Sequence, residues 1–320
     1  MRHSFIAAIL AVSVVAGSAR ADDAIKLIVP FPAGGPVDAA ARLLASEMQG
    51  LLSATMVIEN RGGGGGVIAT DFVARAPADG KTLLMGSQGA HVISGLLQPN
   101  VKYDPVQSFT PIAMIGRASM LLVADPKLPA NNFKEMLELA KTRKLSYGSA
   151  GAGTVMNIAG ELINSGANVH ILHVPYRGVA PALPDLMAGR LDLLPADPPV
   201  LLPQVEAKTV KPLAVFGIER LTALPDIPTT VELGYPGMVM ENWYGLLAPS
   251  GLPSDIATRL EKAALAAIAS PAIQLFMQKG ELRDTLNARE FRARIETDVA
   301  YWRPMLAKLG ISAEAAPSAR

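Results

Sequence analysis

Two glycine-rich turns contain the residues best suited to bind an anion. Residues 31–36 read FPAGGP and residues 147–154 read YGSAGAGT. Each turn follows a short apolar run and precedes a helical pattern, so free backbone N–H groups and the positive end of a helix dipole meet there. Ser149 and Thr154 add hydroxyl groups to the second turn. The two turns together predict a carboxylate clamp, although tight chain connections would explain the glycines equally well.

Nucleotide binding is an alternative use of such turns, and the spacing argues against it. The residues GKT at 80–82 resemble the end of a phosphate-binding Walker A loop, but Arg75 stands where that motif requires glycine. The run GGGGG at 62–66 fits a dinucleotide-binding pattern only trivially, and the glycines at 148–153 have the wrong spacing. We therefore expect no nucleotide cofactor.

Motifs for catalysis or metal binding are missing from the sequence. Ser149 follows glycine directly, whereas a hydrolase elbow places one residue between glycine and serine. The chain has no cysteine, and His170 and His173 are three apart on a predicted strand, which sends them to opposite faces. His91 stands alone, and we expect it at the surface or the edge of the core, although its position after Ser87-Gln88-Gly89 could bring it to the cleft. The prediction is no enzyme, no metal and no cofactor; a hydrolase or isomerase acting on a carboxylate is the catalytic alternative.

The first 21 residues have the features of a secretory signal peptide. Arg2 and His3 supply the positive start, residues 5–17 the apolar stretch, and ARA at 19–21 the cleavage site. We predict cleavage before Asp22 and export to the periplasm. Removing residues 1–21 leaves 27 Lys and Arg against 28 Asp and Glu, a formal charge of about −1, which gives no support for a nucleic-acid or membrane-surface partner.

Alternating apolar runs and helical patterns predict an α/β protein with two sets of βα units. Strands are expected at 26–30, 55–59, 82–86, 145–148, 170–174, 191–195 and 212–216, with one or two more between 111 and 126 and a returning apolar run at 243–248. Helices are expected at 36–49, 67–75, 132–142, 154–165, 180–188, 254–269, 272–278 and 288–309.

The last three predicted helices bring no new strand, so they are expected to cover the sheet of the first set. The chain must then cross between two lobes near residues 115–125 and again near 240–248. We predict a first lobe of residues 22–122 and 244–320 and a second lobe of 123–243. Ligands of open α/β sheets lie beyond the carboxyl ends of the strands, so the site is predicted in the cleft between the lobes.

A third turn, within VPYRG at 174–178, could add side chains to that cleft. Tyr176 offers a hydroxyl and Arg177 a bidentate cation for a carboxylate. An arginine beside a helix N-terminus is equally compatible with an ordinary surface position. We favour Tyr176 as a cleft residue and leave the role of Arg177 open.

Seven segments in chain order carry a resemblance to a known family. They are PFPAGGPVDAAARLLA, VIENRGGGGGVIATDFVARAPADGKTLLMGS, YDPVQSFTPIAMIG, LSYGSAGAGT, HVPYRGVAPALPDLMAGRLD, LPDIPTTVELGYPG and ENWYGLLAPSGLP. The chain resembles the Bug-type substrate-binding proteins of tripartite tricarboxylate transporters. The resemblance implies a type II-like Venus-flytrap receptor, expected to be a monomer, that binds a di- or tricarboxylate, an acidic amino acid or an aromatic acid. It also implies delivery of the ligand to two integral membrane subunits. A periplasmic sensor acting on a membrane signalling partner would need the same cleft, so both roles stay open.

The resemblance also implies ligand-binding positions on both sides of the cleft. These positions are Phe31, Ala33, Gly34, Gly35, Asp38, Ser87, Gln88, Ser149, Ala150, Gly151, Gly153, Thr154, Tyr176 and Asp197. Asp38 lies in the first helical turn, where capping would explain it as well. The chain departs from the usual family pattern at Val37, where a hydroxyl residue is common, and in the proline-rich stretch PADPP at 195–199. Both departures bear on which carboxylate is bound.

Overall fold

Strands and helices alternate along the computed structural model, which describes residues 24–98 and 101–309. The predicted signal peptide, residues 1–21, lies outside the described residues. The strands are β1 (Ile25–Val29), β2 (Met56–Asn60), β3 (Thr82–Ser87), β4 (Phe109–Ala124), β5 (Ser146–Ser149), β6 (Leu172–Pro175), β7 (Leu193–Ala196), β8 (Lys211–Phe216), β9 (Glu241–Pro249) and β10 (Leu286–Asn287). The helices are α1 (Pro36–Leu52), α2 (Val67–Ala74), α3 (Ser94–Leu97), α4 (Phe133–Thr142), α5 (Val155–Ala167), α6 (Val179–Met187), α7 (Pro198–Glu206), α8 (Ser254–Ile268), α9 (Pro271–Lys279) and α10 (Ala288–Leu309), with a π-helical turn at Gln88–Ile93.

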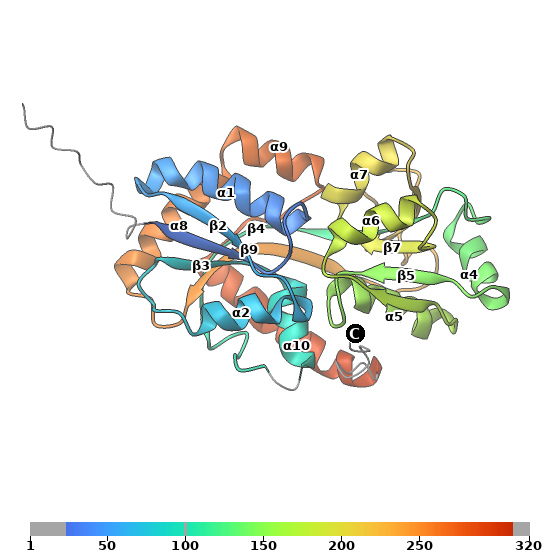
Figure 1. The fold of residues 1–320 in the computed structure, drawn as a ribbon, viewed down its shortest axis with the longest axis horizontal. Coiled ribbons are helices and arrows are strands. Elements are labelled where there is room, and N and C mark those ends of the chain that lie inside the picture. Colours follow the sequence, from blue (N-terminus) through green and yellow to red (C-terminus); the bar gives the residue numbers. More distant parts are fainter. Residues whose placement is uncertain (1–23, 99–100, 310–320) are drawn as a thin grey trace, which may run out of the picture.

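The described chain forms two lobes that lie side by side. Their strands pair in the order β2-β1-β3-β9-β4-β7-β5-β6, and β10 and β8 also pair with β4. Figure 1 shows β1, β2, β3 and most of β9 in one lobe and β5, β6 and β7 in the other. Within each lobe the βα units pair their strands in parallel, β1 with β2 and β3, and β5 with β6 and β7. The α/β class and the two-lobed form predicted from the sequence are confirmed.

The central strands of the first lobe are buried on both faces because helices cover both. Alternate residues of β1 enter different clusters: Leu27 and Val29 pack with α1 and α8, whereas Ile28 packs with residues of α2. This separation follows the two-residue period of a strand. The continuous apolar sequence IKLIV therefore belongs to a doubly covered sheet (Figure 1).

One long strand carries the chain from the first lobe to the second. β4 pairs with β9 from Phe109 to Ser119 and with β8 from Met120 to Ala124. The sequence left open whether this stretch held one strand or two; it is a single strand that changes partners. β9 carries the chain back, starting at Glu241. The change of sheet lies between Ser119 and Met120, and lobe limits of 22–122 with 244–320 and of 123–243 remain a proposal.

An ion cluster ties the two crossing strands together. Glu241 at the start of β9 pairs with Arg117 of β4, and also with Arg283 at 3.2 Å and Arg294 at 3.5 Å. The Glu241 side chain is only 17% exposed, so solvent screens these pairs less than it would surface pairs. The cluster restrains β4 and β9 relative to each other where they pass between the lobes.

The helices at the C-terminal end pack largely as the sequence predicted. α8 and α9 contribute Leu260, Ala264 and Ile273 to the first-lobe cluster that contains α1. α10 packs on β4 and also touches α5 of the second lobe (Figure 1). No single helix of the described chain is both long and apolar enough to span a membrane; α8 and α9 pass that test only as a pair bent by 66°.

Two helical segments beside the cleft have no counterpart in the sequence prediction. α7 begins with Pro198 and Pro199, which suit a first helical turn because the N–H groups there lack intrahelical acceptors. The π-helical turn and α3 follow β3 directly, and Ser87 accepts a hydrogen bond from Ala90 N–H at 3.4 Å. The sequence did not predict α7 because consecutive prolines usually indicate a break. It did not predict the π-helical turn and α3 because the segment is too short to show a clear helical period.

Candidate ligand-binding cleft

A cleft lies where loops of both lobes meet at the carboxyl ends of β1, β3, β5 and β7. Its empty space, including the part open to solvent, is about 530 Å3. The lining residues are Phe31, Pro32, Gly35, Pro36, Val37, Ser87, Gly89, Ala150, Thr154, Val155, Met156, Val179, Ala180, Ala196, Asp197 and Asn242. Residues from the two predicted glycine-rich turns therefore face the same space.

Four helices begin at this cleft. Val37 lies in the first turn of α1, Val155 in that of α5 and Val179 in that of α6, and Asp197 is the N-cap residue of α7. The positive ends of four helix dipoles are thus directed at one small volume. Of the described residues that line it, none is Lys, Arg or His. The attraction for an anion comes from the backbone.

The start of α5 presents backbone donors to the cleft. The Thr154 hydroxyl accepts from Asn157 N–H at 3.4 Å, and the Thr154 carbonyl accepts from Ile158 N–H at 3.0 Å. The N–H groups of Val155 and Met156, both lining residues, have no acceptor in the part of the chain that the structure describes. Two donors at one helix terminus are a suitable site for a carboxylate.

The carboxylate of Asp38 stabilises the turn before α1. Asp38 accepts from Gly34 N–H at 3.0 Å, from Arg42 Nε at 2.9 Å and from Asn60 Nδ2 at 2.9 Å. Burial alone would raise the pKa of Asp38, but the hydrogen bonds from Arg42, Gly34 and Asn60 together lower it. Asn60 also donates to the Phe31 carbonyl at 2.9 Å. Asp38 and Gly34 therefore shape the turn and lie outside the cleft lining.

Asp197 brings the one ionisable side chain among the lining residues. Its Oδ2 accepts from Asn242 Nδ2 at 2.9 Å and from the Tyr244 hydroxyl at 2.6 Å. Burial raises the pKa of Asp197, and the hydrogen bonds from Tyr244 and Asn242 oppose that shift. Oδ1 of Asp197 and Oδ1 of Asn242 are buried and have no hydrogen-bond partner among the described residues.

Ser149 supports the second-lobe turn from behind. Its hydroxyl lies 2.6 Å from His173 Nε2 and accepts from Gly151 N–H at 3.0 Å. Ser149 is fully buried and outside the cleft lining, so this serine–histidine pair has no access to a ligand there. His173 also stacks on Tyr147, with ring centres 5.0 Å apart. His170, expected on the same strand, precedes β6.

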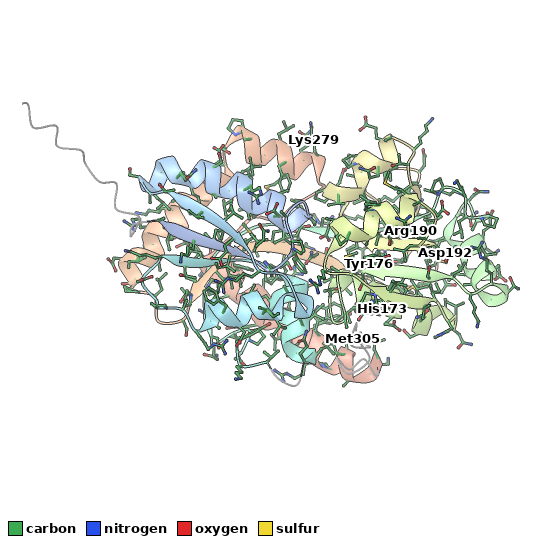
Figure 2. All side chains as sticks on the ribbon, in the orientation of Figure 1. His173, Tyr176, Arg190, Asp192, Lys279 and Met305 are labelled. Carbon is green, nitrogen blue, oxygen red and sulfur yellow. The ribbon has the colours of Figure 1, made fainter. Side chains whose placement is uncertain are left out.

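Tyr176 and Arg177 line a second hollow beside the main cleft. Gly151 and the glycines at 63–66 line it too, and Phe31 and Ala150 border both spaces. The Tyr176 hydroxyl donates to Asp185 at 2.6 Å, and burial followed by that contact raises the pKa of Tyr176 to about 12. Figure 2 places Tyr176 near the junction of the lobes and Asp192 farther out in the second lobe. The Tyr176 hydroxyl is therefore already engaged.

The predicted site residues divide into three groups by position. Those in the main cleft are Phe31, Gly35, Ser87, Ala150, Thr154 and Asp197. Gly151 and Tyr176 line the second hollow. Residues in neither lining are Ala33, Gly34, Asp38, Gln88, Ser149 and Gly153. The sequence prediction missed Asn242, which directly precedes the apolar run expected at 243–248, and the first-turn residues Val155, Met156, Val179 and Ala180.

His91 lies in the core, which corrects the expectation of a surface or core-edge position. It is fully buried, packs against Phe109 with ring centres 4.6 Å apart, and places Nε2 2.8 Å from the Pro105 carbonyl. Burial lowers the pKa of His91 to about 4, and the Pro105 hydrogen bond opposes that shift. His91 is therefore neutral near pH 7. Across the described residues, no group of three or more His, Cys, Asp or Glu side chains could hold a metal ion.

A family model and a curated relative match most of the chain. The model described as "Tripartite tricarboxylate transporter family receptor" matches residues 40–311. The UPF0065 protein in the tcbD-tcbE intergenic region of Pseudomonas sp. is 34% identical over 293 residues, or 90% of this chain and 87% of that protein. A match of this extent covers both lobes.

Solved structures agree in fold and in sequence. The periplasmic binding protein BugD is 34% identical with a TM-score of 0.86, covering 90% of this chain and 98% of BugD. A protein of R. palustris solved with adipate is 33% identical with a TM-score of 0.85, covering 90% and 97%. MatC from Rhodopseudomonas palustris with bound malate is 30% identical with a TM-score of 0.83, covering 88% and 98%.

Proposed function

The chain belongs to the tripartite tricarboxylate transporter receptor family and is of the Bug type, and on this basis we propose that it is a periplasmic receptor for a small organic carboxylate. It binds the carboxylate between its lobes, closes around it by rotation at the two crossing strands, and presents it to a membrane transporter. The receptor performs no chemistry on the ligand.

The observation that carries this proposal is the convergence of helix N-termini on a cleft without a cationic side chain. Backbone donors and helix dipoles bind anions without needing a lysine or arginine. Desolvation of the carboxylate on closure strengthens charge-assisted hydrogen bonds to Val155 and Met156 N–H. The carboxylates adipate and malate, bound by two relatives, support the same ligand class.

Calorimetry on the mature protein, residues 22–320, tests the proposal. The protein is unfolded and refolded to remove ligand acquired during expression, then titrated with mono-, di- and tricarboxylates, acidic amino acids and aromatic acids. At least one is expected to bind with a micromolar or lower Kd, about −8 kcal/mol or stronger. Failure of the whole panel, with no small acid found by native mass spectrometry on the untreated protein, would remove the proposal.

Delivery to a transporter and absence of turnover need separate measurements. Deletion of the gene should abolish uptake of the ligand identified by mass spectrometry, and adding the gene back should restore it. Uptake that is unchanged by deletion would favour a sensory role. Recovery of the ligand unchanged after long incubation with the protein supports a receptor, whereas a converted product would indicate an enzyme.

A further inference from the structure

The start of α7 differs from the starts of the other helices at the cleft. An N-cap side chain ordinarily accepts from the N–H of the second or third helical residue. Here the first two residues are Pro198 and Pro199, which have no N–H, and Val200 N–H donates to the Asp197 carbonyl at 3.2 Å. The Asp197 carboxylate makes no hydrogen bond to its own helix. It is free to extend toward β9.

Residues of β9 donate hydrogen bonds to only one of the two oxygens of the Asp197 carboxylate. Oδ2 is held by Asn242 and Tyr244, at 2.9 and 2.6 Å. Oδ1 of Asp197 and Oδ1 of Asn242 lack partners within the described chain, while both residues are lining residues and only 7% and 4% exposed. Buried acceptors without donors are costly and uncommon. A ligand with a hydrogen-bond donor would supply what is missing.

The charges around the cleft limit which groups the ligand can carry besides one carboxylate. Helix starts at Val37, Val155 and Val179 favour one carboxylate. Asp197, on the α7 side, would repel a second carboxylate brought close to it. Between these groups the lining is apolar, with Pro36, Met156 and Ala196 among its members. The cleft therefore has a donor side, an acceptor side and an apolar wall.

We propose that Asp197, together with Asn242, selects carboxylates that bear a hydroxyl or ammonium donor and disfavours those with a second carboxylate. This inference rests on the proposed carboxylate-binding function and narrows its substrate class. The Tyr244 and Asn242 donors hold Oδ2, so Oδ1 is the oxygen left to accept from a ligand donor. Hydroxyl and ammonium groups share this chemistry, and the experiment separates them.

The test measures Kd values by calorimetry for matched probes that differ only in the group distal to one carboxylate. The four-carbon set is butyrate, 4-hydroxybutyrate, 4-aminobutyrate and succinate. The six-carbon set is hexanoate, 6-hydroxyhexanoate, 6-aminohexanoate and adipate, and the three-carbon set is propionate, 3-hydroxypropionate, 3-aminopropionate and malonate. In at least one set the hydroxyl or ammonium member is expected to bind about tenfold or more tightly than both the methyl and the carboxylate members.

Asp197→Asn should reduce the preference for an ammonium probe about tenfold and improve the relative affinity of the dicarboxylate of the same set. Asp192→Asn is the matched control, because Asp192 is a second-lobe carboxylate bonded to Ser146 and Arg143 and is not a cleft-lining residue. It should leave the ranking unchanged. Circular dichroism confirms that each variant folds; if Asp197→Asn does not, the ranking of the unaltered protein decides alone.

The outcomes separate this inference from the function on which it rests. Tightest binding of succinate, adipate or malonate, with a ranking that Asp197→Asn does not alter, would overturn the inference and leave a carboxylate receptor standing. Tightest binding of a methyl member would do the same. Absence of binding by any carboxylate, in these sets and in the wider panel, would overturn both.

Discussion

The starts of α5 and α7 make the most instructive comparison in this molecule. Both helices follow a strand of the second lobe, β5 and β7, and both begin at the same cleft. Thr154 caps α5 and leaves the N–H groups of Val155 and Met156 toward the ligand. At α7 two prolines remove such donors, and Asp197 supplies an acceptor instead. The same βα geometry thus gives opposite hydrogen-bonding character on two sides of one site.

This difference shows where specificity and affinity can be separated. The α5 side can bind any carboxylate, because its backbone donors contact only the carboxylate group and not the rest of the ligand. The α7 side responds to what the ligand carries besides its carboxylate. Variants of the two sides should therefore have different signatures: uniform loss of affinity at α5, and altered ranking at α7.

The largest expected effect is the pH dependence of stability that His91 causes. It has to be removed before the pH dependence due to Asp197, at the start of α7, can be measured. The unfolded state protonates His91 near its ordinary pKa of 6.5, whereas the folded state does so only near pH 4. Stability is therefore complete above pH 6.5 and falls as the pH drops toward 4, by roughly 3 kcal/mol. His91→Phe should reduce this loss in urea unfolding between pH 4.5 and 7.5, and the smaller contribution of His173, whose pKa burial also lowers, should remain.

His170→Gln, at an exposed position, is the control and should keep the slope. A His91→Phe protein with the same pH dependence as the unaltered one would contradict the assignment. In the His91→Phe background, the contribution of Asp197 should have the opposite sign: because its pKa is raised, its part of the stability is lost as the pH rises from the unfolded pKa of 3.8 through the folded value. The α5 terminus has no titratable group to contribute.

Gly89→Ala should weaken the α5 side. A Cβ at Gly89 would lie 3.0 Å from the Val155 backbone nitrogen, where it crowds that N–H and blocks a ligand oxygen. Loss of one hydrogen bond to a charged group predicts a Kd about 10- to 100-fold higher for every carboxylate that binds. Calorimetry should find the same factor for hydroxyl, ammonium and methyl probes.

Gly50→Ala is the matched control, because a Cβ added at Gly50 in α1 would meet no atom within 4 Å. It should leave each Kd unchanged and stabilise the protein by about 0.5–1 kcal/mol, as expected inside a helix. A Gly89→Ala protein that binds as tightly as the Gly50→Ala protein would contradict the role given to the α5 donors.

Thr154→Ala should have a smaller effect on the same side. It removes the cap on Asn157 N–H and the hydrogen bond from the Thr154 hydroxyl to the Gly151 carbonyl at 2.7 Å. The expected loss of stability is about 1 kcal/mol, with a several-fold weaker Kd and an unchanged ranking of probes. Thr154→Ser keeps the hydroxyl and should retain most of both. A reordered ranking would argue against the division between α5 and α7.

Pro199→Ala should have the smallest effect, on the α7 side. Alanine restores an N–H that the Asp197 carboxylate can cap, which competes with its role toward the ligand. The preference for donor-bearing probes should fall a few-fold, and stability by about 0.4–1 kcal/mol through the freer unfolded chain. Pro203→Ala, at an exposed position of the same helix, should not alter the ranking; a shift of equal size there would count against the cap explanation.

Much of the fold could be predicted because its signals are local. Helix α10, Ala288–Leu309, was predicted with the bounds that the structure gives it, and the two glycine-rich turns do meet at one cleft. They meet because β1 and β5 belong to different lobes and run in opposite directions, so that their carboxyl ends face each other where the lobes join. α7 was missed because a proline-rich stretch usually indicates a break, although proline at the first helical positions favours a helix.

The site was less predictable than the fold, because the partners of its polar groups are distant in the sequence. Asp38 is bound by Asn60, 22 positions away, so its carboxylate holds a turn. Asp197 is bound by Asn242, 45 positions away, on the returning strand. His91 is buried by Phe109 and Trp243, which no local pattern around it indicates.

The sequence by itself determined the βα units, the two glycine-rich turns and the hydroxyl cap of α5, since each depends on the conformational preferences of neighbouring residues. The tertiary structure alone decided which polar atoms remain available to a ligand. Whether a polar atom finds a hydrogen-bond partner depends on every group that the fold brings close to it. Val155 N–H and Asp197 Oδ1 therefore lack partners because of how β9, α1 and the two lobes pack together.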